Sequence, residues 1–258
     1  MKRHLLNLTL AVLTPIVLIA AWFGASNSST NAFFPPLRQI LSRFADLWLF
    51  EHFVSDILPS MKNLVLGFLI AVVLGVLIGF VLATVPLLRA MFEPSLHLLR
   101  GIPPVALVPI LITLVGFGDE MRIASIVIAA VFPTMIATMD GIKAVDSSLK
   151  DVCTVYQLSR RDRLMSVYLP SAGPQIAAGM QVSLLVAFIV MIASEMMGTA
   201  QGIGAMTLLA QQTFMAADMW AGILLLGFIG FASNMVFDIF KNRALSWYIG
   251  SKKLEKVQ

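Results

Sequence analysis

Residues 61–85 read MKNLVLGFLIAVVLGVLIGFVLATV and contain a single charged side chain, that of Lys62. A helix needs about 20 apolar residues, at a rise of about 1.5 Å each, to cross the hydrocarbon core of a bilayer. A helix also satisfies its own backbone hydrogen bonds, so it is the default way for such a run to cross lipid. This stretch therefore predicts a transmembrane helix.

Five further apolar runs lie on either side of this stretch. They cover residues 5–24, 88–115, 123–139, 172–192 and 219–240, and the run at 88–115 is interrupted by Pro103, Pro104 and Pro109. The run at 5–24 exceeds the apolar core of a signal peptide, about 7–15 residues, so we expect a retained first helix. Strands of a membrane barrel would instead show about ten residues of alternating polarity.

The composition agrees with a lipid-facing surface. Hydrophobic residues make up 59% of the 258-residue chain and charged residues 12%, whereas charged residues make up about 25% of a typical soluble domain. We predict an all-α, polytopic membrane protein of about six transmembrane helices, with residues 1–258 forming a single transmembrane domain.

Lysine and arginine gather in four segments that six crossings would place on one side of the membrane. These residues are Lys2, Arg3, Arg89, Lys143, Lys150, Arg160, Arg161, Arg163, Lys241, Arg243, Lys252, Lys253 and Lys256. The opposite side holds fewer, namely Arg38, Arg43, Lys62 and Arg122. Because basic loops stay inside, we predict that both termini are cytoplasmic.

Residues 25–60 form a long segment that this topology places outside the membrane. The segment begins rich in serine and asparagine and ends with Trp48, Phe50 and Phe53. Aromatic residues of this kind anchor helices in the membrane interface. We therefore expect an external loop that contains an interfacial helix.

Residues 141–170 form a second long segment, which the topology places in the cytoplasm. Ser147 and Ser148 are candidate helix caps, and the following apolar residues have helical spacing, namely Leu149, Val152, Val155 and Tyr156. Loops of this length in compact proteins are usually functional. We therefore take this segment as the first candidate site.

Motifs for catalysis and cofactor binding are missing from the sequence. It contains neither the phosphate-binding G-x-x-x-x-G-K-[S/T] nor the hydrolase G-x-S-x-G. His4, His52 and His97 are too scattered to form a zinc ligand pair, and Cys153 is the only cysteine. We expect the chain to bind no cofactor or metal and not to be an enzyme itself.

Polar residues inside apolar runs are costly in lipid and often functional. Arg100 would bind an anionic solute, pair with Glu93 or reach the inner headgroups. Pro103 and Pro104 leave carbonyls unpaired, which is tolerated beside a cavity, so we place them near a polar pathway. Glu195 would serve either a gate or pathway or be an exposed acid at a helix end.

Gly75 and Gly79 are four residues apart in the apolar run at 61–85. Small residues at this spacing let two helices approach closely. The partner helix would lie in the same chain or in a second subunit.

The cytoplasmic segment resembles the signature of the permease subunits of binding-protein-dependent ABC importers. That signature has Glu-Ala-Ala, a glycine four residues after the second alanine, and Ile-x-Leu-Pro nine residues beyond. The matching residues here are Asp151, Val152, Cys153, Gln157, Val167, Tyr168, Leu169 and Pro170. The spacing and the Leu-Pro ending agree, but Gln157 replaces the glycine at the turn between two short helices.

Further motifs follow in the order of the nitrate, sulfonate and taurine branch of this family. They are Phe34-Pro35-Pro36, Ile102-Pro103-Pro104 through Pro109, Gly116-Phe117-Gly118, Phe132-Pro133, Glu195-Met196-Met197-Gly198 and Gly202-Ile203-Gly204. Each motif is weak alone, but their shared order and spacing are specific to this family. The resemblance therefore covers most of the chain.

The resemblance implies a type I ABC importer permease fold, with two copies forming a pore in the inner membrane. It also implies that ABC ATPase subunits bind the cytoplasmic loop, through Asp151, Val152, Cys153, Gln157, Arg160, Arg161, Leu169 and Pro170. A solute-binding protein would dock on the external side. The implied cargo is a small anion such as a sulfonate, taurine or nitrate.

Three alternatives to this interpretation stay open. Arg160 and Arg161 would only set orientation and bind lipid headgroups if the loop had no protein partner. An ion-coupled secondary transporter would need buried ionisable relays and an internal repeat. An intramembrane enzyme would need catalytic groups that converge within the spans.

Overall fold

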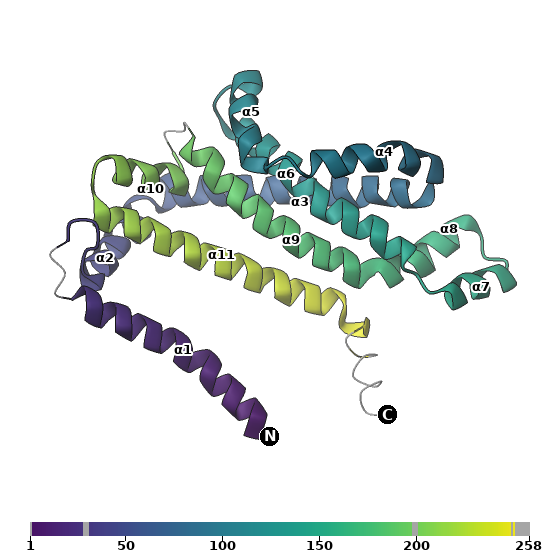
Figure 1. Ribbon diagram of the computed structural model, residues 1–258, viewed down its shortest axis with the longest axis horizontal. Coiled ribbons are helices and arrows are strands. Elements are labelled where there is room, and N and C mark those ends of the chain that lie inside the picture. The colour runs from purple at the N-terminus through teal and green to yellow at the C-terminus, as the bar shows by residue number, and fades with distance from the viewer. Residues whose placement is uncertain (1, 28–30, 198–200, 249, 251–258) are drawn as a thin grey trace. The chain divides into compact units, whose positions relative to one another are not determined.

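The computed structural model describes residues 2–27, 31–197, 201–248 and 250, and the regular elements among them are all helical (Figure 1). The chain divides into two compact units, Met1–Pro59 with Ala200–Gly227, and Ser60–Thr199 with Phe228–Gln258. The first unit holds α1 (Lys2–Ser26), α2 (Leu37–Phe44), the π-helices η1 (Ala45–Glu51) and η2 (Phe53–Ile57), and α10 (Ile203–Gln212).

The second unit holds most of the remaining helices. They are α3 (Leu58–Thr84), α4 (Pro86–Leu99), the 3-10 helix η3 (Pro104–Leu107), α5 (Val108–Val115), α6 (Asp119–Lys143), α7 (Ser147–Val155), α8 (Arg160–Asp162), the π-helix η4 (Arg163–Tyr168) and α9 (Leu169–Met196). The last helix, α11 (Ala216–Ala244), begins in the first unit and continues in the second.

Four helices of the described chain are long and apolar enough to cross a membrane. They lie within Phe53–Thr84, Asp119–Lys143, Arg160–Met196 and Ala216–Ala244. They contain the predicted runs 123–139, 172–192 and 219–240, and the run 61–85 except its last residue, Val85, which caps α4. The run at 5–24 lies in α1, which has 25 residues. The prediction of an all-α membrane protein is therefore confirmed.

The predicted run 88–115 is two helices rather than one. Pro103 has a non-helical backbone, with φ −60° and ψ 121°, and Pro104 opens η3. Proline lacks an N–H group and disfavours the α conformation of the residue before it. The proline pair therefore ends the helical run of α4 and separates it from α5.

The core of the second unit is built around α6, which lies between α3 and α9 (Figure 1). A Cβ atom on Gly75 of α3 would lie 2.9 Å from the Thr134 Cβ and from the Val131 carbonyl oxygen of α6. A Cβ on Gly79 would collide with the backbone oxygen of Met135. The close approach expected of Gly75 and Gly79 therefore occurs within the chain.

A buried polar contact fixes α9 against α6. The Ser183 hydroxyl donates to the Ala130 carbonyl at 2.6 Å and lies 2.8 Å from the Thr134 hydroxyl. Gln181 likewise donates to the side chain of Asn234 at 3.0 Å, which joins α9 to α11. Hydrogen bonds between helices replace those with water, which the hydrocarbon core lacks.

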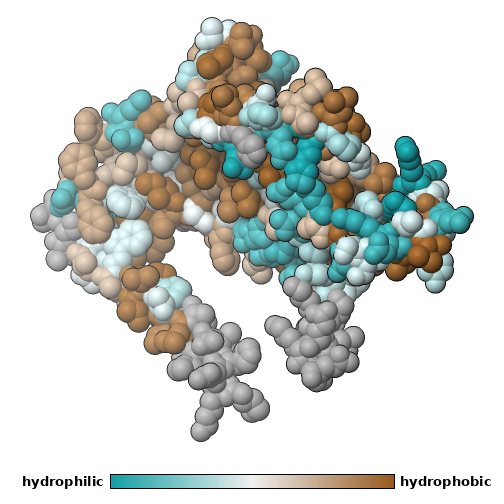
Figure 2. All heavy atoms as spheres, turned by 45° about the vertical axis from the view of Figure 1, so that its right-hand side comes forward, coloured by the Kyte–Doolittle hydropathy of each residue, from teal (hydrophilic) through white to brown (hydrophobic). Residues whose placement is uncertain are grey.

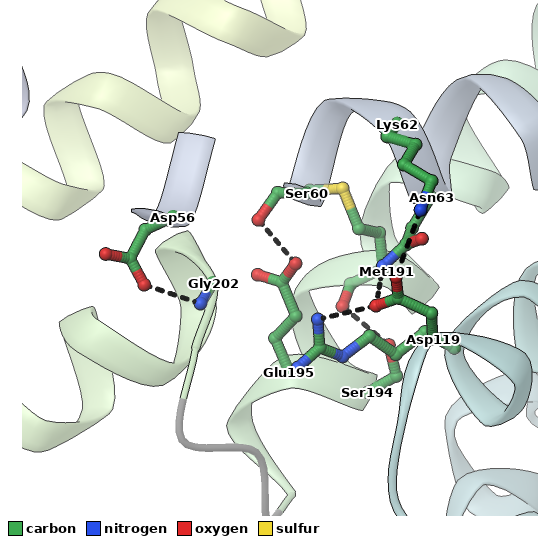
Figure 3. A network of polar contacts seen from close by, with 10 residues as sticks. Asp56, Ser60, Lys62, Asn63, Asp119, Met191, Ser194, Glu195 and Gly202 are labelled. Atoms are coloured by element: carbon green, nitrogen blue, oxygen red, sulfur yellow. Dashed lines mark hydrogen bonds and ion pairs between the residues drawn. The ribbon is translucent and has the colours of Figure 1, made fainter. Parts of the chain in front are cut away.

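Charged side chains join distant parts of the first unit. Arg43 of α2 donates to both carboxylate oxygens of Asp218 at 2.5 and 2.8 Å, and these bonds raise the pKa of Arg43. The buried Asp56 of η2 accepts from the Gly202 N–H at 2.8 Å, where α10 begins (Figure 3). A carboxylate at a helix N-terminus satisfies an otherwise orphaned donor.

The predicted aromatic anchors of residues 25–60 are only partly correct. Trp48 is 2% exposed and therefore packs inside the first unit, whereas Phe53 is 48% exposed. The side chain of Phe50 lies outside the described part of the structure, as do Lys252, Lys253 and Lys256 of the predicted cytoplasmic tail. Burial of Trp48 depends on packing against other elements, which local sequence does not reveal.

Candidate functional site

The segment at residues 141–170, which the sequence predicts to be cytoplasmic, begins with a capped helix. Asp146, rather than the predicted Ser147 or Ser148, is the N-cap of α7, and its carboxylate accepts from the Ser148 N–H at 2.8 Å. Hydrogen bonds from the Ser148 backbone and hydroxyl hold the pKa of Asp146 below its ordinary value. The cap satisfies one orphaned N–H of the first turn and thereby sets where α7 starts.

A left-handed residue ends α7. Gln157 has φ +50°, its N–H donates to the Thr154 carbonyl at 3.1 Å, and the Leu158 N–H donates to the Cys153 carbonyl at 3.0 Å. This pair of bonds is the Schellman motif, which commonly has glycine at the left-handed position. The turn expected from the family signature is therefore present although glycine is replaced by Gln157.

The apolar face of α7 points away from the rest of the second unit. Val152, Val155 and Tyr156 are 48%, 78% and 74% exposed, whereas Cys153 is completely buried. Figure 2 shows hydrophobic side chains among hydrophilic ones where this unit carries α7 and α8. An exposed apolar stripe rimmed by polar groups is typical of a protein-interaction surface.

The basic cluster follows in a second short helix. Ser159 caps α8, because its hydroxyl accepts from the Asp162 N–H at 3.2 Å and donates to the Asp162 carboxylate at 2.6 Å. Arg160 and Arg161 are exposed. The nearby Arg163 donates to the Thr154 hydroxyl at 3.4 Å, which ties η4 to α7.

The predicted Leu169 and Pro170 form the first turn of α9, with Asp151 exposed on α7. Leu169 and Pro170 directly follow the π-helix η4, within one helical run that covers Arg160–Met196. The predicted coupling residues are thus brought together in two capped short helices and the start of a long one. A rigid helix pair of this kind can transmit force from a partner to the membrane helices.

A second candidate site is a cavity of about 500 Å³ in the second unit. It lies between α6, α9 and the segment around η3, and its walls include Arg100 and Pro104, while Pro103 directly precedes Pro104 in the chain. Its size suits a small-molecule site, which typically occupies about 300–1,000 Å³. The cavity therefore lies beside the proline break, its lining is mostly apolar, and the polar pathway stays a prediction.

Arg100 does not pair with Glu93. Glu93 accepts two hydrogen bonds from Arg89, at 3.0 and 2.8 Å. The Arg100 guanidinium has no hydrogen bond or ion pair with any residue that the structure describes. Of the predicted roles of Arg100, pairing with Glu93 is therefore wrong, and the other two stay predictions.

Glu195 lies apart from that cavity. It is completely buried at the end of α9, and the Ser60 hydroxyl of α3 donates to its carboxylate at 2.5 Å (Figure 3). The alternative of an exposed helix-end acid is therefore wrong. Burial came from the packing of α3 over α9, which the position of Glu195 in its own run does not indicate.

A neighbouring polar cluster joins the start of α6 to α3 (Figure 3). Asp119 accepts from Asn63 at 2.9 Å and from Lys62 at 3.4 Å, and Arg122 lies 3.4 Å from the same carboxylate. Together with Ser60 and Glu195, these contacts bind one set of helix ends. The arrangement suits a structural latch or gate more than a solute-binding surface.

Sequence reasoning missed several residues of these sites. Asp140 of α6 and Gln175 of α9 line the cavity with Arg100, and Ser60 holds Glu195. Asp140 was detectable as an acid near the end of an apolar run, but nothing in the sequence placed it opposite Arg100. Val155 and Tyr156 were recognised as an apolar face without any indication that the face is uncovered.

Comparison with known proteins adds an independent line of evidence. The family described as "Binding-protein-dependent transport system inner membrane component" matches residues 71–244. This range includes the whole of the α7–α8 segment and the cavity.

Similar proteins cover nearly the full chain. A Bacillus subtilis protein named as an aliphatic sulfonates transport permease, SsuC, is 29% identical and aligns with 92% of this chain and 86% of its own length. The taurine transport system permease protein TauC of Escherichia coli is 26% identical over 94% of this chain and 90% of its own. The nitrate import permease protein NrtB of Synechococcus elongatus is 31% identical over 58% of this chain and 53% of its own length.

Solved structures share the fold. The MetNI methionine ABC transporter in inward-facing conformations matches with a TM-score of 0.57 at 18% identity, covering 75% of this chain and 96% of that chain. An amino acid ABC transporter matches with a TM-score of 0.53 at 17% identity, covering 70% of this chain and 88% of that chain. These likenesses establish an ABC importer permease fold. By the extent of the family match, the chain belongs to the inner membrane components of binding-protein-dependent transport systems.

Proposed function

We propose that the chain is the pore-forming permease subunit of an ATP-driven importer, and that an ABC ATPase docks on the α7–α8 segment. The observation that carries this proposal is the uncovered apolar face of α7, with Val155 and Tyr156 the most exposed. Because both of its ends are capped, α7 is a rigid helix that a groove on an ATPase could bind and displace. The chain needs such a partner because it has no phosphate-binding motif of its own.

The same proposal assigns the chain an orientation in the membrane. Arg160 and Arg161 lie beside the docking face and would sit in the cytoplasm with both termini. The ATPase contact thus combines an apolar stripe on α7 with basic groups on α8. Basic groups of this kind set orientation and steer an acidic partner.

The remaining partners follow from membership of the family. A solute-binding protein would deliver the cargo on the external side, and a second copy of this chain would complete the pore. In this arrangement residues 1–258 act as one permease domain. The family match favours this importer over the ion-coupled secondary transporter.

The proposed cargo is a small anion such as a sulfonate, taurine or nitrate. The names of the similar permeases SsuC, TauC and NrtB support this class. The unpaired guanidinium of Arg100 in the cavity supports it as well, because a cation there lowers the cost of taking an anion into the membrane. Pro103 and Pro104 would shape this pathway, and Glu195 would act at its far end.

Substitution on α7 tests the docking proposal. Val155→Asp introduces a charge into the apolar face, so the ATPase that co-purifies with the permease should fall about tenfold or more. Val155→Leu keeps the face apolar and is the matched control, for which retention should equal the wild type. Equal retention of the ATPase by Val155→Asp and the wild type, with both chains inserted in the membrane, would overturn the proposal.

A further inference from the structure

An apolar groove of about 700 Å³ lies between α3, α9 and α11 in the second unit. Its lining comes from residues 61–72 of α3, from Met180 and Leu184 of α9, and from residues 229–240 of α11. Ser233 carries the one hydroxyl among these lining residues. The groove shares no lining residue with the cavity beside the proline break, so it is a separate site.

The groove opens onto the outside of the helix bundle. Leu69, Val236 and Phe240 on its walls are exposed, whereas Leu64 and Phe237, which also line it, are buried. All three helices are long and apolar enough to cross a membrane, so hydrocarbon rather than water surrounds its mouth. An empty groove would forfeit the dispersion contacts of its lining, and an apolar occupant would restore them.

The groove has the length of one acyl chain. Ile229 and Phe240 bound it on α11, which at about 1.5 Å per residue is a length of about 16 Å. The hydrocarbon core of a bilayer is about 30 Å thick, so each leaflet contributes about 15 Å. A membrane-spanning helix of a second copy would cross the whole core and extend well beyond the groove. The length therefore favours a lipid chain as the occupant.

A basic residue continues the groove side of α11 beyond its apolar end. The lining residues Ile229, Ser233, Val236 and Phe240 recur every three or four positions, which places them on one face of the helix. Arg243 follows three residues after Phe240, in the last turn of α11, and therefore lies on the same face. It is exposed and forms no ion pair within the described part of the chain.

The acid on this part of α11 is already paired. Lys241 donates to the Asp238 carboxylate at 2.5 Å and to the side-chain oxygen of Gln181 at 2.7 Å. Asp238 also accepts from Asn234 at 3.4 Å. Since Lys241 and Asp238 together carry no net charge, Arg243 makes this end of the groove positive. The third N–H of the Lys241 ammonium remains for a further acceptor.

We propose that this groove binds an acyl chain of an anionic membrane phospholipid, and that Arg243 binds the phosphate group of that lipid. A guanidinium can donate to two phosphate oxygens at once, and Lys241 can donate its third N–H to the same group. Trp247, four residues beyond Arg243, is exposed, and tryptophan is enriched where helices meet headgroups. The site belongs to the cytoplasmic leaflet in the proposed orientation, and it requires only that the chain spans a membrane.

Lipid competition tests the headgroup end of the site. The full chain, purified in mild detergent with its bound partners, receives equal amounts of phosphatidylglycerol and phosphatidylcholine with the same acyl chains. Native mass spectrometry then counts the lipids that it retains. The wild type should retain phosphatidylglycerol about tenfold over phosphatidylcholine, the ratio expected for one charge-assisted hydrogen bond, and Arg243→Gln should bring this ratio close to one.

Arg38→Gln provides the matched control. Arg38 is an exposed arginine of α2 and does not line the groove, so its neutralisation should leave the lipid ratio unchanged. Equal retention of the two lipids by the wild type would overturn the inference. An unchanged preference for phosphatidylglycerol in Arg243→Gln would overturn it as well, because the headgroup would then bind elsewhere.

Photolabelling of the wild type tests the acyl end and needs no variant that folds. Phosphatidylglycerol with a diazirine in its acyl chain is irradiated on the protein, and peptide mass spectrometry maps the adducts. Val236 and Phe240 should be labelled severalfold more than Phe228 and Phe231, which are similarly exposed on α11 but do not line the groove. Even labelling would indicate ordinary surrounding lipid, and an unlabelled groove would indicate that another chain covers it. Either result would overturn the inference.

Discussion

Gln157 adopts the left-handed backbone conformation, with φ +50°, which residues other than glycine rarely adopt. A left-handed conformation costs an ordinary residue roughly 1–2 kcal/mol, because Cβ approaches a carbonyl oxygen. The two hydrogen bonds of the Schellman motif, at 3.1 and 3.0 Å, hold the turn against this cost. The sharp turn between α7 and α8 therefore depends on these local capping hydrogen bonds rather than on a glycine.

Substitution of Gln157 should reveal this strain. Gln157→Gly relieves this strain, but glycine also makes the unfolded chain more flexible, which offsets part of the gain. The net stabilisation of the α7–α8 turn should be about 1 kcal/mol. Gln157→Val places a β-branched residue at positive φ and should destabilise it by about 2 kcal/mol. Hydrogen exchange of the amides in residues 147–158 measures both changes, and equal protection in the two variants would contradict the strain.

Asp146 caps α7 through its ionised form. Because its folded-state pKa is lowered, the carboxylate contributes stability above its unfolded pKa, near 3.8, and loses it as the pH falls through the lower folded value. The cap is therefore intact at neutral pH. At pH 7, Asp146→Ala should lower the exchange protection of residues 147–155, whereas Asp146→Asn, also a good N-cap, should largely keep it. Unchanged protection in Asp146→Ala would show that the cap does not hold the helix.

At the scale of elements, α6 is held between two helices by residues without bulky side chains. Gly75 and Gly79 of α3 face one side of it, and Gly179 of α9 lies against Ala137 on the other. Such contacts bring backbones close enough for dispersion and weak hydrogen bonds to replace the hydrophobic effect, which does not act between helices in lipid. The bundle therefore depends on the absence of side chains at a few positions.

Gly79→Ala should destabilise the second unit. Its new Cβ would meet backbone of α6, which cannot move aside as a flexible side chain can, so we expect a loss of about 1–3 kcal/mol. Gly227→Ala is the matched control, since that glycine of α11 has nothing within 4 Å of the added Cβ. Thermal unfolding in detergent should show a lower midpoint for Gly79→Ala and an equal or higher one for Gly227→Ala. A lower midpoint in the control alone would contradict this account of packing.

At the scale of the whole molecule, the proposed importer would require that force generated on an ATPase partner reaches the membrane helices. The structure provides a continuous route in the second unit, since α7 and α8 precede η4 and α9, and α9 forms one wall of the cavity. The basic groups of α8 lie at the start of this route. Movement of α9 relative to α6 would change the shape of the cavity walls.

Charge reversal on α8 tests this route in the complete importer. Arg160→Glu with Arg161→Glu should lower the amount of solute transported per ATP hydrolysed about tenfold, because like charges would face an acidic partner. Arg243→Glu reverses a basic residue at the end of α11 and controls for orientation by the positive-inside rule. An unchanged ratio in the double variant, with normal insertion, would show that the arginines serve orientation or lipid binding only.

Much of the fold was predictable because its determinants are local. Uninterrupted apolar runs indicated the long helices, and the Pro103–Pro104 pair indicated the break between α4 and α5. The short α10 was not predicted, since it has little amphipathic pattern and its N-terminus is satisfied by Asp56 from a distant part of the chain. The N-cap was placed one residue late because Asp146, Ser147 and Ser148 are all good caps.

For the candidate site, too, only the local features were predictable from the sequence. The spacing of Val152, Val155 and Tyr156 predicted one apolar face, but periodicity cannot tell a face that packs from a face that remains uncovered. Burial of Trp48 and Glu195 was likewise invisible, because it depends on which helix covers them. The long separation of Arg100 from Asp140 and Gln175 in the chain hid their common cavity.

The class of protein, the order of its membrane helices and the position of the proline break follow from composition and from the pattern of apolar residues. These properties depend on each residue's own affinity for water or lipid and on the conformations its backbone allows. The tertiary structure decided which residues share the cavity, that Glu195 is buried beside Ser60, and which face of α7 stays uncovered. Those outcomes depend on contacts between helices far apart in the chain, and no local pattern records such contacts.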